Sequence, residues 1–494
     1  MVVAGAREQS PVRDLVPFLL VVAMWASLTL DGLFTFFSGD DLMNLYKVFT
    51  EPSHPPLKGI LHFWSSDYYR PLGGLVYLGL YEGFGFDPRP FRIAGFAILL
   101  GNLWLGLHVL WRLLGSPRRA ALALLLMAYN ARMNDLYLNF GTVYETLCFA
   151  FYYGAFLWWM RIRDGGRSPR PVEHAGIVSL YLLALCAKEM AVSFPVVLLA
   201  YELLLAPRDA PRREHTLAAA RRVAPYVLLT VVFLVGKLQG PESLARLDAY
   251  RPSMGLGSYL HASSHYLNNV FLVDWCSPGR AAAAILGALA LSVATGSPQV
   301  LFGLVLFLVS LLPVSFIVPR SGFVLYLGTL GLGTWAVALL DWAVARGWRR
   351  SATAASEGWP AFLIALALLW PIHYHFKQVF DGHVKSFIGR NQDFYESFLR
   401  TGLRPLPGDL VLLLNDPYDD DVYDPLFLLA LAQHDPALEL HRATDPSRTL
   451  EPLSRYRYVL EYAGGEMTVL KSPGRIEPGL ERAAARLGPR LPPD

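Results

Sequence analysis

Two adjacent carboxylates are the first residues in this sequence that could do chemistry. The stretch FTFFSGDDLMNLYK puts Asp40 and Asp41 directly after an apolar run that begins near Leu15. A carboxylate near a hydroxyl can act as a general base, although the same pair could be a solvated helix end. On a helix the two side chains would point about 100° apart. One base with one orienting carboxylate therefore fits better than the facing acid and base of a glycoside hydrolase.

A second pair of charges interrupts an apolar segment of 32 residues that runs from Ala175 to Ala206. As one helix this segment would be about 48 Å long, too long for a bilayer core of about 30 Å. Arginine clusters flank both ends and belong on the cytoplasmic side, so the segment is predicted to cross twice, with Lys188 and Glu189 at its external turn. The pair is either an ion pair at a helix turn or an ammonium directed at an anion, and we favour the second.

Other isolated charges are predicted on the same side. Arg320 stands alone between two apolar stretches, and Tyr69 and Arg70 end the first external loop. The stretch YNARMNDLYLNFGTVYETL adds Asp135 and Glu145. Each of these is an ordinary boundary charge when taken singly. Gathered on one side, they suggest a pocket for a phosphate group beside carboxylates.

Composition indicates what kind of protein must position these charges. Of 494 residues, 54% are hydrophobic and 17% are charged, and the mean hydropathy is +0.35, which is typical of a polytopic membrane protein. The formal net charge of +3 provides no basic field, so no nucleic-acid partner is expected. Cys148, Cys186 and Cys276 are too widely spaced to indicate a disulfide framework or a zinc site.

Apolar stretches predict about eleven membrane crossings, and the fold class expected is an all-α transmembrane bundle. The stretches lie near residues 15–37, 90–112, 119–130, 143–160, 175–187, 190–206, 223–238, 280–296, 299–316, 321–345 and 358–375. The first is expected to be a retained span rather than a cleaved signal peptide. Basic clusters between alternate stretches place the loop 38–89 and the chain after about residue 375 outside the membrane.

Two domains follow from this reading. Residues 1–375 are expected to form the transmembrane domain, with a catalytic external loop at 38–89, in a bacterial inner membrane. Residues 376–494 are expected to form a small extracytoplasmic α/β domain. There, PGDLVLLLNDPYDDD is typical of a strand and turn, DPLFLLALAQ of a short helix, and YRYVLEYAGGEMTVLK of a hairpin with two glycines at its tip.

Two further groups of residues could bind a metal ion, but each has a simpler interpretation. Asp419, Asp420 and Asp421 form an acidic run that we interpret as a solvated loop tip. His261 and His265 lie four residues apart, as ligands on one helix face would, but the glutamate of a metalloprotease motif is absent. We interpret this pair as part of a surface helix.

Several pieces of the sequence, in their order, resemble the GT-C superfamily of membrane glycosyltransferases, and within it the O-mannosyltransferase-like branch that uses polyprenyl-phosphate sugars. The pieces are GDDLMNLY, YRPLGGLVY, NDLYLNFGTVYE, LCAKEMAVSFPVVLLAYELLL and LLPVSFIVPRSGFVLYLGTLGLG, and they extend across residues 15–345. Their order and spacing carry the resemblance, because no single piece is specific. Arg320 departs from the family pattern, since it lies six residues before Tyr326 and not directly before an aromatic pair.

The resemblance implies that a hexose moves from a polyprenyl-phosphate donor to an acceptor on the extracytoplasmic side. The implied site comprises Asp40 and Asp41 as catalytic groups, Lys188, Arg320 and Arg70 on the donor phosphate, and Glu189, Tyr69, Asp135 and Glu145 in support. A divalent cation, Mg²⁺ or Mn²⁺, would take Asp40, Asp41, Asp135 and Glu145 as ligands. The sugar, the acceptor (protein, lipid or glycan) and metal dependence stay open.

Two alternatives use the same charges differently. A transporter or flippase of lipid-linked sugars would use them for translocation. It would be expected to show inverted repeats or broken helices near the membrane midplane, which the sequence does not reveal. A noncatalytic surface-assembly protein would bind its partners through the C-terminal tail.

Overall fold

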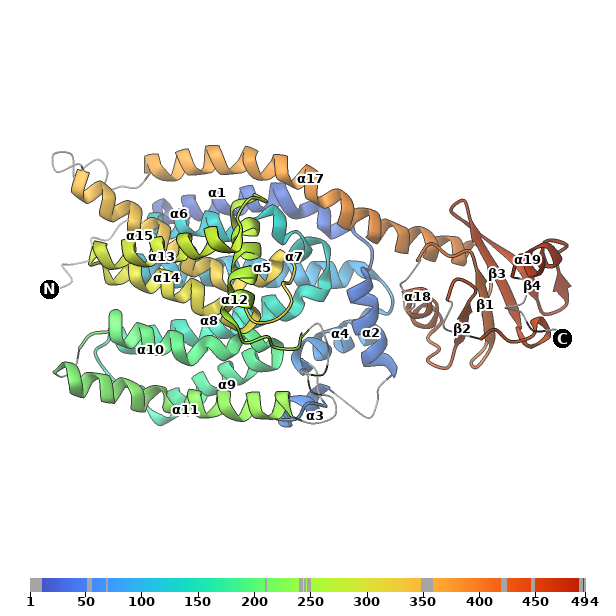
Figure 1. Ribbon diagram of the computed structural model, residues 1–494, viewed down its shortest axis with the longest axis horizontal. Coiled ribbons are helices and arrows are strands. Elements are labelled where there is room, and N and C mark those ends of the chain that lie inside the picture. The colour runs from blue at the N-terminus through green and yellow to red at the C-terminus, as the bar shows by residue number, and fades with distance from the viewer. Residues whose placement is uncertain are drawn as a thin grey trace.

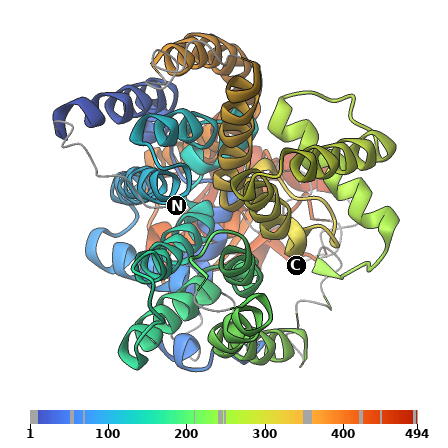
Figure 2. The ribbon, with the colours of Figure 1, turned by 90° about the vertical axis from the view of Figure 1, so that its left-hand side faces the viewer.

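The computed structural model consists of a bundle of helices joined to a five-stranded sheet by one long helix, α17 (Figure 1). The structure describes residues 11–50, 56–67, 70–208, 211–239, 250–347, 359–418, 424–445 and 449–487, together with residues 243, 246 and 492. Viewed from the end of the bundle that is far from the sheet, the sheet lies behind the helices (Figure 2).

Each of the eleven expected stretches is helical. The elements that contain them are α1 (Pro11–Thr29) with η1 (Leu30–Phe34), α5 (Pro88–Leu114), α6 (Pro117–Ala128), α8 (Val143–Asp164), α9 (Pro171–Ala187), α10 (Phe194–Leu204), α11 (Arg212–Leu238), α13 (Pro278–Thr295), α14 (Pro298–Leu311), η8 (Gly322–Gly328) with α15 (Thr329–Gly347), and α17 (Trp359–Arg400). Six helical segments of the described chain are long and apolar enough to cross a membrane: 15–34, 88–114, 212–238, 278–295, 322–346 and 359–400. The count of eleven crossings stays a prediction.

Shorter elements lie between the long helices in the chain. They are α2 (Gly39–Thr50), α3 (Pro56–Leu61), α4 (Pro71–Phe84), η2 (Ala131–Met133), α7 (Asp135–Leu138), η3 (Phe140–Thr142), η4 (Glu189–Ser193), α12 (Leu256–Phe271) and η7 (Leu312–Val314). Among them, α2 and α4 are at the end of the bundle that faces the sheet (Figure 1). Several of the shorter elements interrupt the path between two long helices. These interruptions bring polar residues from separate parts of the chain to one end of an otherwise apolar bundle.

Local sequence explains where the long helices begin and end. α5 begins with Pro88, and the Asp87 side chain before it accepts a hydrogen bond of 3.0 Å from the Arg89 backbone N–H. Proline is favoured in the first turn because it has no N–H that needs a partner there. Gly115 ends the helix with φ of 69°, a left-handed conformation that glycine adopts without strain.

Glycine also permits close packing between α14 and α15. A Cβ atom on Gly303 would lie 2.5 Å from the backbone nitrogen of Trp335. A Cβ on Gly331 would lie 2.4 Å from the backbone nitrogen of Phe307. Small residues let two helix backbones approach each other, which is the usual way in which helices associate where water provides no driving force.

The long helix α17 crosses the expected domain boundary. It continues without a break past residue 375 to Arg400, so the boundary between residues 375 and 376 falls inside a helix. An ionic network fastens α17 to η1: Lys377 Nζ and Lys385 Nζ donate to Asp31 at 2.7 and 2.5 Å, and Lys377 also donates to Asp381. The sheet begins only at β1, ten residues beyond the end of α17.

The C-terminal sheet has the order β2-β1-β3-β4-β5. Its strands are β1 (Leu410–Leu414), β2 (Glu439–Arg442), β3 (Tyr458–Ala463), β4 (Glu466–Ser472) and β5 (Arg475–Ile476), and α18 (Asp424–Gln433) and α19 (Gly479–Leu487) accompany them. β1 pairs in parallel with β2 and β3, whereas β3, β4 and β5 are antiparallel. The expected strand, short helix and hairpin are all present, and Gly464 and Gly465 at the hairpin tip have φ of 61° and 85°.

Helix α18 attaches this domain to the bundle. The Phe427 ring stacks on Tyr46 of α2 with ring centres 4.3 Å apart. The Tyr81 hydroxyl of α4 donates to the Leu431 carbonyl at 3.2 Å. α18 therefore packs beside α2, the helix that carries Asp40 and Asp41 (Figure 1).

Candidate functional site

The two adjacent aspartates at the start of α2 have opposite environments. Asp41 is fully buried. Its carboxylate accepts hydrogen bonds from the Ser38 backbone N–H at 2.9 Å, the Tyr77 hydroxyl at 2.9 Å and the Arg92 guanidinium at 3.1 Å. Since Tyr77 belongs to α4 and Arg92 to α5, these contacts hold the start of α2 against both helices.

Asp40, in contrast, is exposed and borders two cavities. Its Oδ2 accepts a hydrogen bond of 3.1 Å from the Asn139 amide, and its backbone carbonyl accepts one of 2.7 Å from Asn44. Gly141 lets the chain before α8 lie close to Asp40, since a Cβ atom at Gly141 would lie 2.7 Å from the Asp40 Cβ. The carboxylate is thereby oriented but keeps accessible surface.

The first cavity, which we call the cationic cavity, has a volume of about 460 Å³. Its charged lining consists of Arg70, Lys188, Lys237 and Arg320, and of Asp40, Glu145 and Glu189. They come from α2, α8, α11 and η4, and from the residues that precede α4, η4 and η8. Four cations against three carboxylates give the lining a positive balance, which suits an anionic group.

Two of the cations form ion pairs inside this cavity. Arg70 Nε lies 3.1 Å from both carboxylate oxygens of Glu189, and its terminal nitrogen lies 2.9 Å from one of them. Lys188 Nζ donates to Glu145, and both side chains are nearly buried. A bound phosphate would share these donors with the carboxylates. The carboxylates keep the cations charged and in place before it binds.

The other two cations are positioned differently. The Arg320 guanidinium lies over the Tyr250 ring, 4.1 Å from its centre, and its backbone carbonyl lies 2.9 Å from His265 Nε2. Lys237 Nζ donates to the Ser65 carbonyl at 2.7 Å. A cation over an aromatic ring is attracted to the ring, so the contact with Tyr250 holds the Arg320 guanidinium at the cavity.

Arg70 also has an unusual backbone. It precedes α4 with φ of 44°, in the left-handed region that non-glycine residues rarely occupy. Such a conformation costs about 1–3 kcal/mol, and it persists where surrounding contacts hold it. Here the bidentate contact with Glu189 supplies that restraint, and the guanidinium is directed into the cavity as a result.

The remainder of the cationic cavity is apolar. Its hydrophobic lining includes Val192, Phe233, Leu234, Leu238, Phe316, Ile317 and Phe323. Several of these residues belong to α11, whose membrane-length segment is largely exposed. A ligand with an anionic head and a hydrocarbon chain would match this division of the lining.

The second cavity, which we call the acidic cavity, has a volume of about 390 Å³ and lies where α2, α7, α17 and α18 meet. Asp40, Asp135 and Asp424 contribute carboxylates to it. His383, Phe387 and Phe427 also line it, and among its described lining residues none is lysine or arginine. Asp40 and Met43 border both cavities, so the Asp40 carboxylate lies between a cationic and an acidic space.

The carboxylates of the site differ in the direction in which their surroundings shift the pKa. Enclosure by protein, together with the negative charges of Asp41 and Glu145, raises the pKa of Asp40 above its ordinary value. Burial, followed by the charges of Asp40 and Glu145, raises the pKa of Asp135 to about 6. Burial alone would raise the pKa of Glu189, but the adjacent Arg70 outweighs it and holds that pKa low. A raised pKa makes the Asp40 carboxylate a stronger base, which suits a general base.

The residues expected to bind a divalent cation are not gathered in one place. Asp41 faces Arg92, Glu145 is paired with Lys188, and Asp135 lies in the acidic cavity. In the part of the chain that the structure describes, no three histidine, cysteine or acidic side chains are placed to hold a metal ion. The four expected ligands therefore do not form one cluster in the described structure, and a divalent cation stays a prediction.

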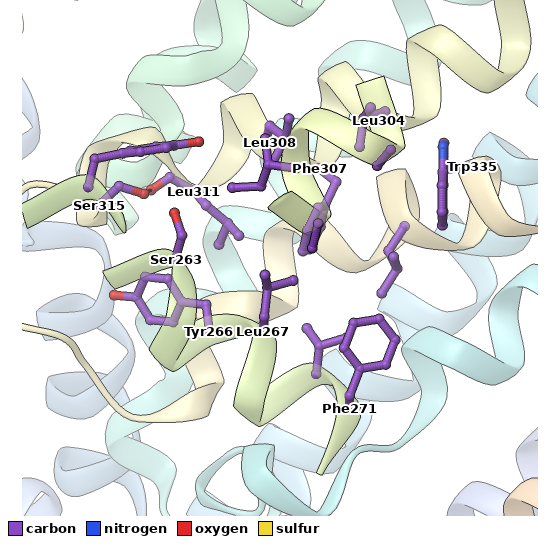
Figure 3. Close-up of a pocket in the computed structure, with 16 residues that line it drawn as sticks. Ser263, Tyr266, Leu267, Phe271, Leu304, Phe307, Leu308, Leu311, Ser315 and Trp335 are labelled. Atoms are coloured by element: carbon purple, nitrogen blue, oxygen red, sulfur yellow. Dashed lines mark hydrogen bonds between the residues drawn. The ribbon is translucent and has the colours of Figure 1, made fainter. Parts of the chain in front are cut away.

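A third cavity, of about 160 Å³, lies among α12, α13, α14 and α15 and is almost entirely apolar. Leu267, Phe307 and Trp335 are among the side chains that surround it (Figure 3). The Tyr266 hydroxyl on its wall accepts a hydrogen bond of 3.4 Å from the Arg320 backbone N–H. Its described lining residues include no charged side chain.

The structure thus places most of the expected site residues, but not all of them together. The cationic cavity gathers Asp40, Arg70, Glu145, Lys188, Glu189 and Arg320, whereas Asp135 lines only the acidic cavity and Asp41 lines neither. Tyr69 and the Asp419–Asp421 run lie outside the described residues. His265 contacts the Arg320 carbonyl and Asn269, and His261 is exposed, so this pair forms no metal site.

Sequence reasoning missed several residues of the site: Asn139, Lys237, His383 and Asp424, and Tyr77 and Arg92 behind Asp41. Lys237 was detectable as a lone cation at the outer end of an apolar helix. Asp424 had no local signal, because it approaches Gly39 from a helix in the other domain. A Cβ atom added to Gly39 would lie 3.0 Å from both Asp424 carboxylate oxygens.

Comparison with known proteins gives distant similarity to solved structures. No family model and no curated protein sequence matches the chain. The chain is similar to the crystal structure of the Archaeoglobus fulgidus oligosaccharyltransferase in complex with Zn and sulfate, at 10% sequence identity and a TM-score of 0.45, with 90% of this chain and 67% of that chain covered. A similarity of this degree carries no argument on activity, which must come from the site itself.

Proposed function

We propose that this protein is an integral-membrane glycosyltransferase of the GT-C type that moves a sugar from a polyprenyl-phosphate donor to an acceptor. One observation carries the proposal: the Asp40 carboxylate lies on the shared wall of a cationic cavity with an apolar extension and of an acidic cavity without lysine or arginine in its described lining. Transfer of a sugar from a phosphate to a hydroxyl requires one space for the phosphate donor, another for the acceptor, and a base that reaches the acceptor hydroxyl.

The donor would occupy the cationic cavity. Its phosphate would lie among Lys188, Arg70 and Arg320, which offer charged N–H donors in a partly dry site. Its hydrocarbon chain would follow the apolar wall toward α11. Lys237, on the same helix, adds a fourth positive charge to this wall.

The reaction would be a single displacement. The acceptor oxygen forms a bond to the anomeric carbon while the bond from that carbon to the phosphate oxygen breaks. The hydroxyl proton moves to the Asp40 carboxylate, and the electron pair leaves with the polyprenyl phosphate. Because phosphate is a good leaving group whose charge the cations stabilise, no acid is needed to protonate it.

Asp41 takes a positioning role in this proposal. Buried against Arg92 and Tyr77, it fixes the first turn of α2 and thereby the direction of the Asp40 side chain. Glu145 and Glu189 hold the cations, and Asp135 contributes to the electrostatics of the acidic cavity. The positive-inside pattern supports an extracytoplasmic position for the site and the C-terminal domain.

The test uses membranes that contain the full chain and a panel of labelled polyprenyl-phosphate sugars. We expect wild type to release polyprenyl phosphate from one sugar donor, and Asp40→Asn to lower that rate by about 100-fold or more. Transbilayer movement of the lipid-linked sugar without cleavage would instead favour the flippase alternative. Equal cleavage by wild type and Asp40→Asn would remove Asp40 as the base and with it the proposal.

A further inference from the structure

The acidic cavity restricts what the acceptor can be. Three carboxylates, from Asp40, Asp135 and Asp424, border a space of about 390 Å³. The one other titratable residue in its described lining is His383. Like charges at close range repel strongly where protein partly replaces water, so a phosphate or carboxylate on the acceptor would be disfavoured there.

The same lining suits hydroxyl groups. Ionised carboxylates only accept hydrogen bonds, and each can accept several, so a molecule that offers many O–H donors matches them. Ser38 and Asn139 add further polar atoms, and the Asn139 amide already orients Asp40. The volume lies within the range of about 300–1,000 Å³ that small-molecule sites occupy.

Aromatic rings provide the apolar side of the cavity. Phe427 is held by stacking on Tyr46, and Phe387 lies on α17 with the Arg390 guanidinium 3.9 Å from its ring centre. A sugar ring has C–H groups that pack on aromatic faces as well as hydroxyls that bind carboxylates. The lining therefore provides both kinds of surface that a carbohydrate presents.

We infer that the acceptor is a hydroxyl of an uncharged sugar unit, which binds in the acidic cavity between α2, α17 and α18. This inference rests on the proposed function, because it assigns the space opposite the donor. It also gives the C-terminal domain a direct role: Asp424 and Phe427 belong to α18, so that domain supplies part of the acceptor site. The sugar could be free or attached to a lipid, and the experiment separates the two.

The experiment follows donor consumption and product formation by the full-length protein in membranes, with the donor that the panel identifies. Acceptors are octyl glucoside and octyl glucuronide, which differ by one carboxylate, and methyl glucoside, which lacks the alkyl chain. We expect kcat/KM for octyl glucoside to exceed that for octyl glucuronide by about ten-fold or more. Equal use of methyl and octyl glucoside would indicate a free glycan, and loss of activity with methyl glucoside a lipid-linked sugar.

Two variants test the cause of this preference. Asp424→Asn and Asp135→Asn each remove one negative charge from the cavity and should reduce the ratio of glucoside to glucuronide use by several-fold. The matched control is Asp274→Asn, because the Asp274 side chain is 83% exposed and lines neither cavity, so the ratio should stay that of wild type.

The outcomes are separable from those of the proposed function. If the donor is cleaved but the glucuronide is used as well as the glucoside, the acceptor inference is overturned and the transferase proposal stands. The inference is also overturned if no glycoside raises donor consumption above the rate in water. If the donor is never cleaved, the transferase proposal itself fails.

Discussion

Arg92 of α5 and Asp41 of α2 form an ion pair of 3.1 Å from which water is almost completely excluded. The same Arg92 guanidinium also donates to the backbone carbonyls of Thr35 and Phe36, just before α2. One buried cation thus fixes both the loop that leads into α2 and the first turn of the helix. Asp40 is not part of this ion pair, but its position depends on it, because Asp40 lies in the same helical turn.

Removing the Asp41 charge should lower the free energy of unfolding of the protein. Asp41→Ala leaves the Arg92 guanidinium buried without its carboxylate, which typically costs about 3–5 kcal/mol. We expect a clear fall in Tm, measured for the detergent-solubilised protein. Asp274→Ala, at an exposed ion pair with Arg132, is the control and should change stability by about 0.5 kcal/mol or less. An Asp41→Ala protein as stable as the control would contradict the positioning role.

Asp135 makes stability depend on pH. Its pKa is raised to about 6 in the folded protein, from an ordinary value of 3.8, so folding favours the protonated form. The stability associated with that proton is complete below about pH 4 and is lost as pH rises through about 6. Asp135→Asn should therefore raise Tm at pH 8, by the equivalent of at most about 3 kcal/mol, and change little at pH 4. A shift of equal size at both pH values would show that Asp135 does not titrate in this way.

The Lys188 and Glu145 pair predicts effects of opposite sign on the donor phosphate. Lys188→Ala removes a charged donor from the cationic cavity and should weaken binding of polyprenyl phosphate by about ten-fold or more. Glu145→Gln removes the competing carboxylate, releases Lys188 and should tighten binding. The measurement is a binding titration with polyprenyl phosphate at low and moderate salt. Weakening by both substitutions would mean that the pair acts as a structural unit and does not bind phosphate.

Sequence reasoning located the elements well because their signals are local. Eleven apolar stretches all became helices, and the hairpin with Gly464 and Gly465 at its tip formed as expected. The end of the last membrane helix was not located, because hydropathy falls near residue 375 while the helix continues to Arg400. Its continuation depends on contacts such as those of Lys377 with Asp31, which are far apart in the sequence.

The site was only partly predictable for the same reason. Lys188 and Glu189 were conspicuous as charges in an apolar segment, and both line the cationic cavity. The different roles of Asp40 and Asp41 could not be predicted from the sequence. Two neighbouring aspartates differ only in their tertiary contacts, which the sequence does not give. Arg92 looked like one basic residue near the start of a membrane helix, and nothing local indicated that it pairs with Asp41.

Gly141 gives a test of how closely Asp40 must be placed. A Cβ atom at this position would lie 2.7 Å from both the Asp40 Cβ and the Asn139 side-chain oxygen, so Gly141→Ala must move one of them. A displacement of about 1 Å at a reacting group can cost about 100-fold in rate, and we expect kcat to fall by at least about ten-fold with KM for the donor little changed.

Gly154→Ala is the matched control for this substitution. It lies within α8, where a Cβ would meet nothing within 4 Å, and alanine favours helix more than glycine does. Activity should be that of wild type and Tm equal or slightly higher. If Gly141→Ala were as active as Gly154→Ala, the close contact between η3 and the start of α2 would not determine the reaction. The base would then have to be sought among the other carboxylates of the two cavities.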